Sequence, residues 1–582
     1  MKRCELSLFL CVWMAACGVP ESTVQQTPLS SEGVVIYPAE TVITMTASET
    51  GNAIAIRDGN VLAVDGLADL EQRYPGAEID PSFIEKTIVP GLIDPHIHMS
   101  LSSLQYATPL TPPWPMATPQ GMVRGLPNRE AFFERLQEIV DETPEGEPLI
   151  VYGFHNLVHG DLVKADLDAV TTDRPLVIWH YSSHDFYLNS AALEWAEIDV
   201  ALHEQFEGVD LDPSGALTGR IYEDAIPPLM ASIGPILLAP DRLSRGMEGF
   251  SGLLRSGGVT TVADLGYGIF TLPLEDANIR GNWRSIEHAG YRLYLVPEHR
   301  AFDAAFGDDR VETVLGMVSG DIETPAPVLA QVKFFTDAAF YSQTMRVSEP
   351  GYLSGQSSGT QGLWVLQPDE IAPTIQPYWD AGLAVRIHSN GDAAQSATLD
   401  ALAELRPMAP DQKFIFEHAG LFSPEQVIRA ADLGAGVSAA SHYVFYLGEA
   451  YQSPLGPERG NWILPLASLS AAGVPVTLHS DAPLAPPLPL RAASVHMLRS
   501  TREGGELTPG EKLSAQEALE SITIDAAYAL GLENEIGSIA PGKFADFTIL
   551  EANPLLTPAD AWDDIEIWGV VIAGDKQPLD DK

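Results

Sequence analysis

Short apolar runs bounded by turn-forming residues lie close together at both ends of the chain. They cover 34–37, 41–46, 53–57, 61–64, 547–550 and 565–572. Asp58-Gly59-Asn60 has the composition of a hairpin turn between two of them. Two strand-rich ends around a long middle predict one small β-sandwich domain, built from residues 34–88 and 531–582.

The middle of the chain alternates apolar runs of strand length with stretches of helical period. The strand-like runs are 87–93, 259–264, 292–296, 331–335, 384–387, 414–416, 435–438 and 474–478. Ser423-Pro424-Glu425-Gln426 has the N-cap, first-turn proline and capping-box residue of a helix start. This alternation predicts an α/β fold, a TIM (β/α)8 barrel over 89–530. Residues 99–250 are too long for one connection and predict an inserted subdomain after strand 1, over the barrel mouth.

The N-terminus has the pattern of an export signal. Two basic residues precede the apolar run 6–14, which is too short to span a bilayer permanently. Met14-Ala-Ala-Cys17 is similar to a bacterial lipobox, although plain signal-peptidase cleavage stays open. We therefore expect a signal peptide at 1–16, a lipid anchor on Cys17 and a polar tether over 17–33. The expected location is the periplasm or the outer membrane of a bacterium, as an anchored lipoprotein.

The amino-acid composition excludes several classes of chemistry and of binding partner. All three cysteines lie in the first 17 residues, so the mature body has neither a disulfide nor a catalytic thiol. The chain has 79 acidic and 33 basic residues, a formal net charge of -46, and such a surface repels nucleic acid and anionic lipid. We expect no nucleic-acid partner and no membrane contact beyond the anchor. A homo-oligomer is compatible with the sequence.

Chemistry-bearing side chains follow several of the predicted strands. The first strand leads to His96-Ile97-His98, and residues i and i+2 of an extended segment project to the same side, so both imidazoles can face one metal. Later strands end near Lys333, His388, His418 and Asp481. Barrel enzymes carry their chemistry at these C-terminal strand ends. One pair is weak evidence, but the set in this order predicts a metal site.

This order of motifs resembles the metal-dependent amidohydrolase superfamily, in particular the YtcJ-like, amidohydrolase family 3 branch that includes N-substituted formamide deformylase. The matching pieces are Pro90-Gly-Leu-Ile-Asp-Pro-His96-Ile-His98, Leu188-Asn-Ser-Ala-Ala-Leu193, Gly258-Val-Thr-Thr-Val-Ala-Asp264, His388-x-x-Gly391-Asp392, Glu417-His418-Ala, Leu455-Gly-Pro-Glu-Arg459, His479-Ser-Asp481-Ala-Pro and Gly537-Ser-Ile-Ala-Pro-Gly-Lys-Phe-Ala-Asp546. The resemblance covers nearly the whole mature chain.

The resemblance implies one or two divalent metal ions. His96, His98 and Asp481 would hold one ion, and His388 and His418 a second. Lys333 would bridge the two as a carboxylated lysine; the alternative is a Lys333 that only pairs with Asp337 or another carboxylate. Zinc is the default ion for a site of imidazoles completed by a carboxylate.

The implied activity is hydrolysis of a non-peptide C–N bond in a small-molecule amide, N-acyl or N-formyl substrate. The metal would activate water, and Asp481 would take the proton of that water and pass it to the leaving nitrogen. His184 and His442 are expected to contact the carbonyl or oxyanion. The remaining histidines that we considered are interpreted as packing or surface residues: His155, His159, His180 and His479.

Two alternatives remain open. A hydrolytic deaminase of the same superfamily would place Glu soon after the fifth-strand histidine, where this chain has Ser389-Asn390-Gly391-Asp392. A catalytically inactive solute-binding lipoprotein would not require the full set of metal ligands.

Overall fold

The computed structural model describes residues 32–579 except 48, 223–224, 286–288 and 356. The predicted signal peptide, Cys17 and the tether up to residue 31 therefore lie outside the described residues. Within the described ranges, no helix is both long enough and apolar enough to cross a membrane.

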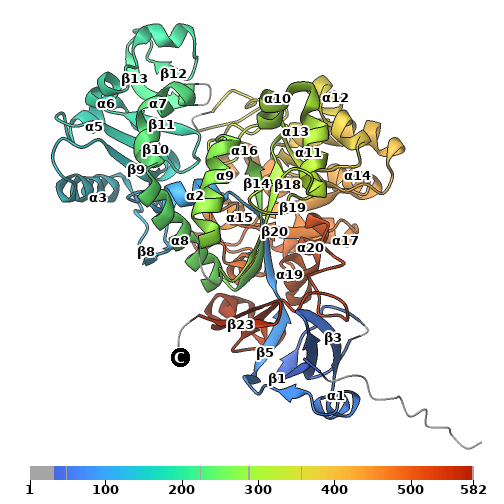
Figure 1. Ribbon diagram of the computed structural model, residues 1–582. Helices are drawn as coiled ribbons and strands as arrows, with labels where there is room; N and C mark the ends of the chain where they lie inside the picture. Colours follow the sequence, from blue (N-terminus) through green and yellow to red (C-terminus); the bar gives the residue numbers. More distant parts are fainter. Residues whose placement is uncertain (1–31, 48, 223–224, 286–288, 356, 580–582) are drawn as a thin grey trace, which may run out of the picture.

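Strands from both ends of the chain pair in one β unit, which lies below the rest of the molecule in Figure 1. The strands are β1 (Val35–Val42), β2 (Ala53–Arg57), β3 (Asn60–Asp65), β4 (Glu78–Ile79), β5 (Phe83–Pro90), β21 (Phe547–Leu550), β22 (Ile567–Ile572) and β23 (Asp575–Pro578). Their order is β23-β22-β21-β5-β1-β2-β3, and β4 pairs with β1. Antiparallel pairing of β5 with β21 joins the two ends. A sandwich arrangement of this unit stays a prediction.

The middle of the chain has a TIM-barrel-like α/β fold. Its strands are β6 (Leu92–Ile97), β14 (Val259–Tyr267), β15 (Arg292–Pro297), β16 (Gln331–Phe335), β17 (Ala384–Ser389), β18 (Phe414–His418), β19 (Gly436–Ala440) and β20 (Val476–His479). They form two parallel sheets, β15-β14-β6 and β16-β17-β18-β19-β20. Isolated parallel bridges connect the sheets, Glu298 with Lys333 on one side and Ile97 with Ala482 on the other.

The first predicted strand, 87–93, is divided in the structure. Residues up to Pro90 belong to β5 of the terminal unit, and the first barrel strand, β6, begins at Leu92. Gly91 lies between them, and a Cβ there would be 2.0 Å from Thr260 Oγ1, so only glycine fits this close approach. The backbone N–H of Gly91 donates to Asp546 O at 3.0 Å, which ties the crossing point to the C-terminal segment.

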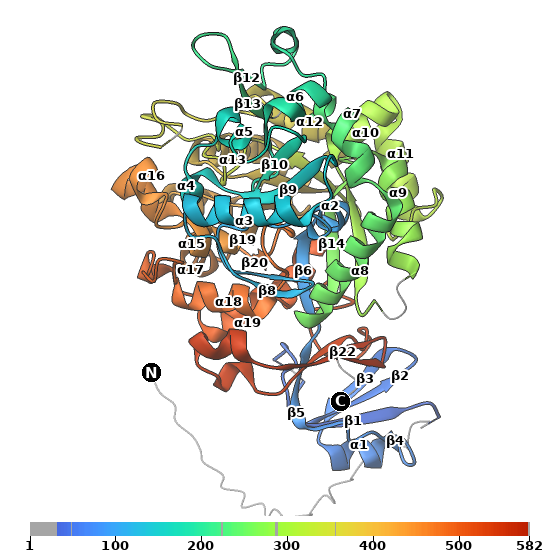
Figure 2. The same cartoon turned by 90° about the vertical axis from the view of Figure 1, so that its left-hand side faces the viewer.

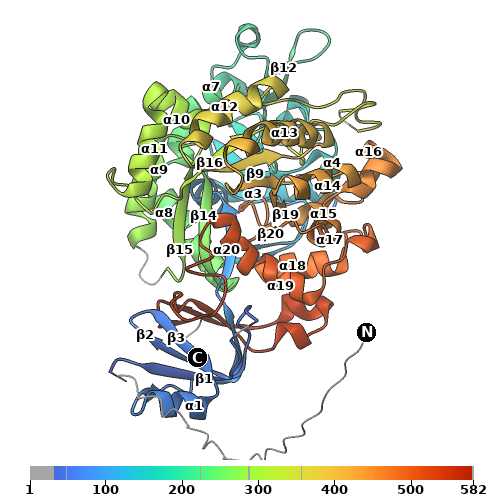
Figure 3. The same cartoon turned by 90° about the vertical axis from the view of Figure 1, so that its right-hand side faces the viewer.

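Helices cover the outside of the barrel strands, as Figure 3 shows for α12, α13 and α14. The helices after β14 are α9 (Leu272–Gly281), α10 (His299–Phe306), α11 (Arg310–Ser319), α12 (Pro368–Asp380), α13 (Asp392–Leu405), α14 (Pro424–Asp432), α15 (His442–Leu447), α16 (Gln452–Arg459), α17 (Leu466–Ala471), α18 (Pro489–Leu498), α19 (Ala515–Ser521) and α20 (Ile524–Leu530). The helix start predicted at Ser423 is confirmed, because Ser423 and Gln426 form a reciprocal capping box at α14.

The long segment between β6 and β14 folds around its own five-stranded sheet, which faces the viewer in Figure 2. The sheet order is β12-β13-β11-β10-β9, with β9 (Leu149–Phe154), β10 (Leu176–His180), β11 (Asp185–Leu188), β12 (Val209–Leu211) and β13 (Leu217–Tyr222). Its other elements are α2 (Met99–Tyr106), β7 (Met116–Thr118), β8 (Gly121–Val123), α3 (Arg129–Glu142), α4 (Asn156–His159), α5 (Lys164–Asp168), α6 (Ser190–Trp195), α7 (Ile226–Leu237) and α8 (Pro240–Ser256). The Tyr181 hydroxyl donates to Leu484 O, which joins the segment to the loop after β20.

Thr548 links the terminal unit to the barrel, which generates a prediction about stability. Its fully buried hydroxyl accepts from Leu92 N at 3.0 Å and donates to Gly258 O at 2.7 Å. Thr548→Val keeps the shape but leaves a buried N–H and C=O unpaired, so we expect the free energy of unfolding to fall by about 1–3 kcal/mol. Thermal unfolding of the purified variant measures this loss.

The control is Thr172→Val, because Thr172 is exposed and, among the described residues, its hydroxyl donates to the neighbouring Asp173 alone. That change should alter stability by less than about 0.5 kcal/mol. Equal unfolding midpoints for the two variants would contradict the linking role of Thr548.

Candidate metal centre

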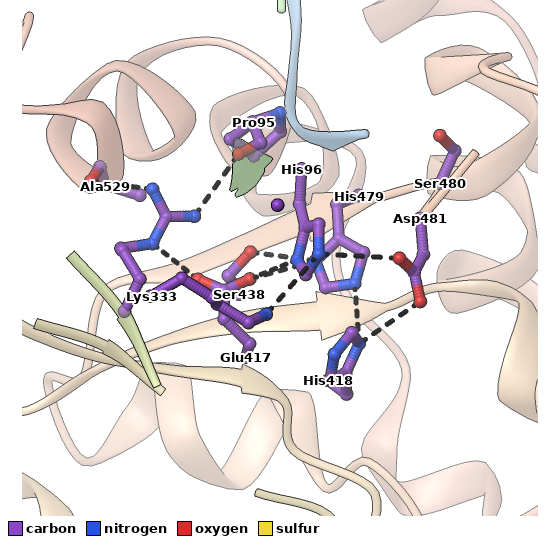
Figure 4. Close-up of polar contacts among 12 residues, drawn as sticks. Pro95, His96, Lys333, Glu417, His418, Ser438, His479, Ser480, Asp481 and Ala529 are labelled. Carbon is purple, nitrogen blue, oxygen red and sulfur yellow. Dashed lines mark hydrogen bonds and ion pairs between the residues drawn. The ribbon is translucent and has the colours of Figure 1, made fainter. Parts of the chain in front are cut away.

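The ends of β6, β16, β18 and β20 bring chemistry-bearing side chains into one buried cluster, drawn in Figure 4. His96 Nε2 is 3.4 Å from Asp481 Oδ1, and His98 Nε2 is 3.2 Å from the same oxygen. Each of these three residues offers a donor atom within 4.8 Å of the other two. The structure therefore places together the residues that the sequence suggested for one metal ion.

Asp481 and a further residue of the cluster, His418 at the end of β18, have unusual backbone conformations. His418 has φ 67° and Asp481 has φ 55°, both in the left-handed region of backbone conformation that residues other than glycine rarely adopt. Such conformations persist where the surrounding structure enforces them, and they cluster at functional sites. Here they accompany the approach of His418 Nδ1 to Asp481 Oδ2, at 3.5 Å.

Lys333 points into the same cluster from β16. Its side chain is buried, and its Nζ lies 3.5 Å from His96 Nε2. Burial lowers the pKa of Lys333 to about 8, while the nearby charges of Glu417 and Asp481 act in the opposite direction.

Asp337 does not pair with Lys333 in the described residues. Its carboxylate accepts backbone N–H groups from Asn390, Gly391 and Arg346, at 2.9, 2.9 and 2.8 Å. Asp337 therefore holds the loop after β17, and of the alternative in which Lys333 only pairs with a carboxylate, pairing with Asp337 is not seen among the described residues. Carboxylation of Lys333 stays a prediction.

His388 lies beside the cluster. Its ring centroid is 4.5 Å from that of His418. Its Nε2 contacts Ala338 O at 3.1 Å and Asn390 Nδ2 at 3.0 Å. Burial lowers the pKa of His388 to about 3, so the ring is neutral, as metal ligation requires. Its pairing with His418 on a second ion stays a prediction.

A buried ion pair lies beneath the cluster, and sequence reasoning missed it. Glu417 Oε2 accepts from His96 Nδ1 at 2.7 Å, and its Oε1 accepts from Arg386 Nε. All three side chains are fully buried. A carboxylate on the far nitrogen of a metal-binding histidine fixes its tautomer and orientation. Glu417 directly precedes His418 in the sequence, but nothing in the sequence shows that it reaches His96.

His479 was interpreted as a packing or surface residue, but the structure places it in the cluster. Its Nε2 is 3.2 Å from His418 Nδ1, and its Nδ1 is 2.8 Å from Ser438 Oγ. A usable signal was present, because His479-Ser480-Asp481 repeats the i, i+2 spacing of His96-Ile97-His98. His155, His159 and His180 are buried within the inserted segment.

Of the two histidines expected to contact the carbonyl, His442 is the more deeply buried. It begins α15, its ring stacks on Tyr341 at 5.4 Å, and neither ring nitrogen has a hydrogen-bond partner among the described residues. Burial lowers its pKa to about 4, although the charge of Asp481 opposes this. His184 is half-buried between β10 and β11, and its backbone N–H donates to Ser182 Oγ at 3.1 Å.

The donor atoms fit a divalent cation. Burial lowers the pKa of His96, His418 and His479 well below the usual value, which leaves neutral imidazoles with free lone pairs. Burial would raise the pKa of Asp481, but His418 and His98 hold it well below its usual range. Its buried Oδ1 lies 3.2 Å from His98 Nε2 and 3.4 Å from His96 Nε2. A buried carboxylate oxygen of this kind is a natural position for a cation.

The TIM-barrel-like fold, with imidazoles and a carboxylate at its strand ends, defines the class of metal-dependent hydrolases. Residues 85–575 match the amidohydrolase family, and the chain belongs to that family. Its members are hydrolases that act on C–N bonds. The resemblance inferred from the motifs is therefore confirmed.

Relatives of known name share about a quarter of their residues with this chain. The putative amidohydrolase YtcJ of Bacillus subtilis is 24% identical, over 90% of this chain and 95% of its own length. N-substituted formamide deformylase of Arthrobacter pascens is 26% identical, over 81% of this chain and 84% of its own. An uncharacterized metal-dependent hydrolase from Pyrococcus horikoshii OT3 has a similar fold, with a TM-score of 0.67 and 20% identity over 90% of this chain and 99% of its own.

The buried pair of Arg386 and Glu417 generates a second prediction. Glu417→Leu leaves the Arg386 guanidinium buried without a counter-charge, so we expect the free energy of unfolding to fall by about 3–5 kcal/mol. It also removes the acceptor of His96 Nδ1, which should weaken metal affinity roughly 10- to 100-fold. Thermal unfolding and a competition titration with a chromophoric chelator measure the two effects.

The double variant Arg386→Met/Glu417→Leu separates these effects. It removes both buried charges and should recover much of the lost stability. Metal affinity should stay low, because His96 Nδ1 still lacks its acceptor. Recovery of both properties would show that the His96–Glu417 contact is irrelevant to metal binding.

Proposed function

We propose that the protein hydrolyses a non-peptide C–N bond of a small amide, N-acyl or N-formyl compound at a centre of one or two divalent ions, with zinc as the expected ion. The observation that carries this proposal is the convergence of His96, His98 and Asp481 within 4.8 Å, inside a chain of the amidohydrolase family. The similarity to the A. pascens deformylase supports an N-formyl or N-acyl substrate. When bound, the metal supplies a Lewis acid that activates water and polarises the substrate carbonyl.

In this proposal His96, His98 and Asp481 hold one ion, while His388 and His418 hold a second. Lys333 would complete the centre as a carbamate, because a carbamate would offer anionic oxygens to the cations where an ammonium group would repel them. The burial of Lys333 and its distance of 3.5 Å from His96 Nε2 support this position. A burial-lowered pKa favours the neutral amine, which is the form that reacts with carbon dioxide.

Asp481 is the proposed general base and acid. Water adds to the carbonyl carbon, Asp481 accepts the proton of that water, and the same proton goes to the nitrogen as the C–N bond breaks. The products are a carboxylic acid and an amine. The low pKa of Asp481, set against burial by its imidazole neighbours, supports an ionised carboxylate at neutral pH.

His442 and His184 are the proposed contacts to the substrate oxygen. A buried neutral imidazole can donate a hydrogen bond to a developing oxyanion. The two unpartnered ring nitrogens of His442 support this role. A charge on His184 would contribute to the lowered pKa of His388, after the larger effects of burial and of Lys333.

The residue after Ser389 bears on the choice between amide hydrolysis and deamination. Asn390 directs its amide Nδ2 to His388 Nε2 at 3.0 Å. An amide side chain cannot shuttle a proton as a glutamate does. This contact favours amide hydrolysis.

Export and lipid anchoring at Cys17 are also part of the proposal, and the proposed location of the activity is therefore outside the cytoplasm.

Asp481→Asn tests the proposed base. At saturating metal we expect kcat to fall at least about 100-fold, because asparagine cannot take up the proton, while the thermal midpoint of the loaded protein changes little. Steady-state kinetics at saturating metal measure kcat, and thermal unfolding of the loaded protein measures the midpoint. The control is Asp212→Asn, an exposed turn residue, which should keep full activity.

The same samples test the metal requirement. Wild-type protein should contain one to two divalent ions per chain and lose activity on chelation. A metal-free sample that remains active would refute the proposed function, and high activity of Asp481→Asn at saturating metal would remove Asp481 as the base.

A substrate comparison tests the bond class. Metal-loaded protein should release amine from N-formyl or N-acyl amines and should release no ammonia from amino-purines. Amine and ammonia assays on both panels distinguish the outcomes. Ammonia release alone would establish the deaminase, and ligand binding with no turnover on any panel would establish the solute-binding alternative.

A further inference from the structure

His479 is the last residue of β20 and directs its ring toward His96 and His418. The His479 side chain is 1% exposed. Its ring centroid is 4.5 Å from that of His96 and 5.2 Å from that of His418. Each of the three rings offers a nitrogen within 4.8 Å of the other two. Three buried imidazoles from three different strands thus face one point.

The separations between donor atoms match those around a single ion. With metal–nitrogen distances of about 2.0–2.1 Å, tetrahedral ligand atoms lie roughly 3.3 Å apart. His479 Nε2 is 3.2 Å from His418 Nδ1. The separation between His96 Nε2 and Asp481 Oδ1 is 3.4 Å, which is close to the same value. His479 Nε2 therefore has the spacing of a ligand that shares an ion with His418.

The other ring nitrogen of His479 is held as expected for a metal ligand. Its Nδ1 is 2.8 Å from Ser438 Oγ, which orients the ring so that Nε2 faces the cluster. His96 has the same arrangement, because its Nδ1 is held by Glu417 and its Nε2 faces Asp481. Metal-binding histidines almost always anchor the far nitrogen in this way.

We propose that His479 is a metal ligand, which shares one ion with His96 and His418. This inference rests on the proposed metal centre at these strand ends, but it revises the division of His96 and His418 between two ions. Three imidazoles from the protein, with a fourth position open, form a common catalytic zinc site. The first ion would then bind without help from a carboxylated Lys333. In this chain β20 and the residues that follow it would supply two ligands, His479 and Asp481.

Three variants test the ligand role. His479→Asn removes the imidazole, Ser438→Ala removes only the anchor of Nδ1, and His496→Asn removes a fully buried histidine of α18 whose Nε2 is bonded to Ser441 O at 3.2 Å. Each folded protein is loaded with one equivalent of Zn²⁺. X-ray absorption at the zinc edge counts the imidazole ligands, and chelator competition gives the affinity.

We expect at least three imidazoles on zinc in the wild-type protein and one fewer in His479→Asn, with affinity more than about 100-fold weaker. Ser438→Ala should keep the imidazole number and lose about 10- to 100-fold in affinity, as for an outer-shell partner. His496→Asn should match the wild type in both. Zinc affinity should also be the same with and without dissolved carbon dioxide.

An unchanged imidazole number in folded His479→Asn would overturn the inference, even if activity fell, and would make His479 a hydrogen-bonded neighbour of His418. If that variant does not fold, the wild-type measurement decides, because two or fewer imidazoles at one equivalent of zinc contradict the ligand role. Wild-type protein that binds no metal would contradict the proposed function itself, which is a separate outcome.

Discussion

The buried ion pair between Arg386 and Glu417 is the interaction on which the site depends. Removing two charged groups from water costs several kcal/mol for each, and only close pairing and further hydrogen bonds offset that cost. Arg386 meets this requirement with additional bonds to Gln331 Oε1, Ala529 O and Pro95 O. The pair therefore connects β16, β17, β18, α20 and the residue before His96. The second carboxylate oxygen of Glu417, Oε2, accepts from His96 Nδ1 and so holds His96 in one tautomer.

The histidines of the cluster lie on barrel strands, whereas residues of the inserted segment pack against α15. Strand-borne residues such as His96, His418 and His479 are held by backbone ladders and outer-shell bonds. Trp114 stacks on Tyr446 of α15 at 4.4 Å and donates to the Tyr181 hydroxyl at 3.1 Å, so the inserted segment packs against α15. The proposed place of substrate selection is the inserted segment and the loops at the barrel rim, because loops and insertions can change without loss of the strands.

Most of the strand positions could be predicted from local pattern. The run 331–335 corresponds to β16, and the other later runs overlap β14, β15 and β17–β20. Buried parallel strands are short apolar stretches bounded by turns, so the pattern is local and readable. The first strand was assigned wrongly because β5 and β6 are both apolar, and only the contact of Gly91 with Thr260 and Asp546 separates them. That contact joins residues far apart in the chain.

The sequence by itself determined the family and the order of the motifs, and it supplied His96, His98, Lys333, His388, His418 and Asp481 as candidates, because strand ends and i, i+2 spacing are local properties. Only the tertiary structure decided which side chains meet. It engaged Asp337 with backbone N–H groups, brought Glu417 to His96 and placed His479 against His418. These contacts join different strands of the barrel, so they depend on strand register and on the left-handed turns at His418 and Asp481. Strand register and the left-handed backbone conformation of these two residues are properties of the packed barrel, and no short stretch of sequence determines them.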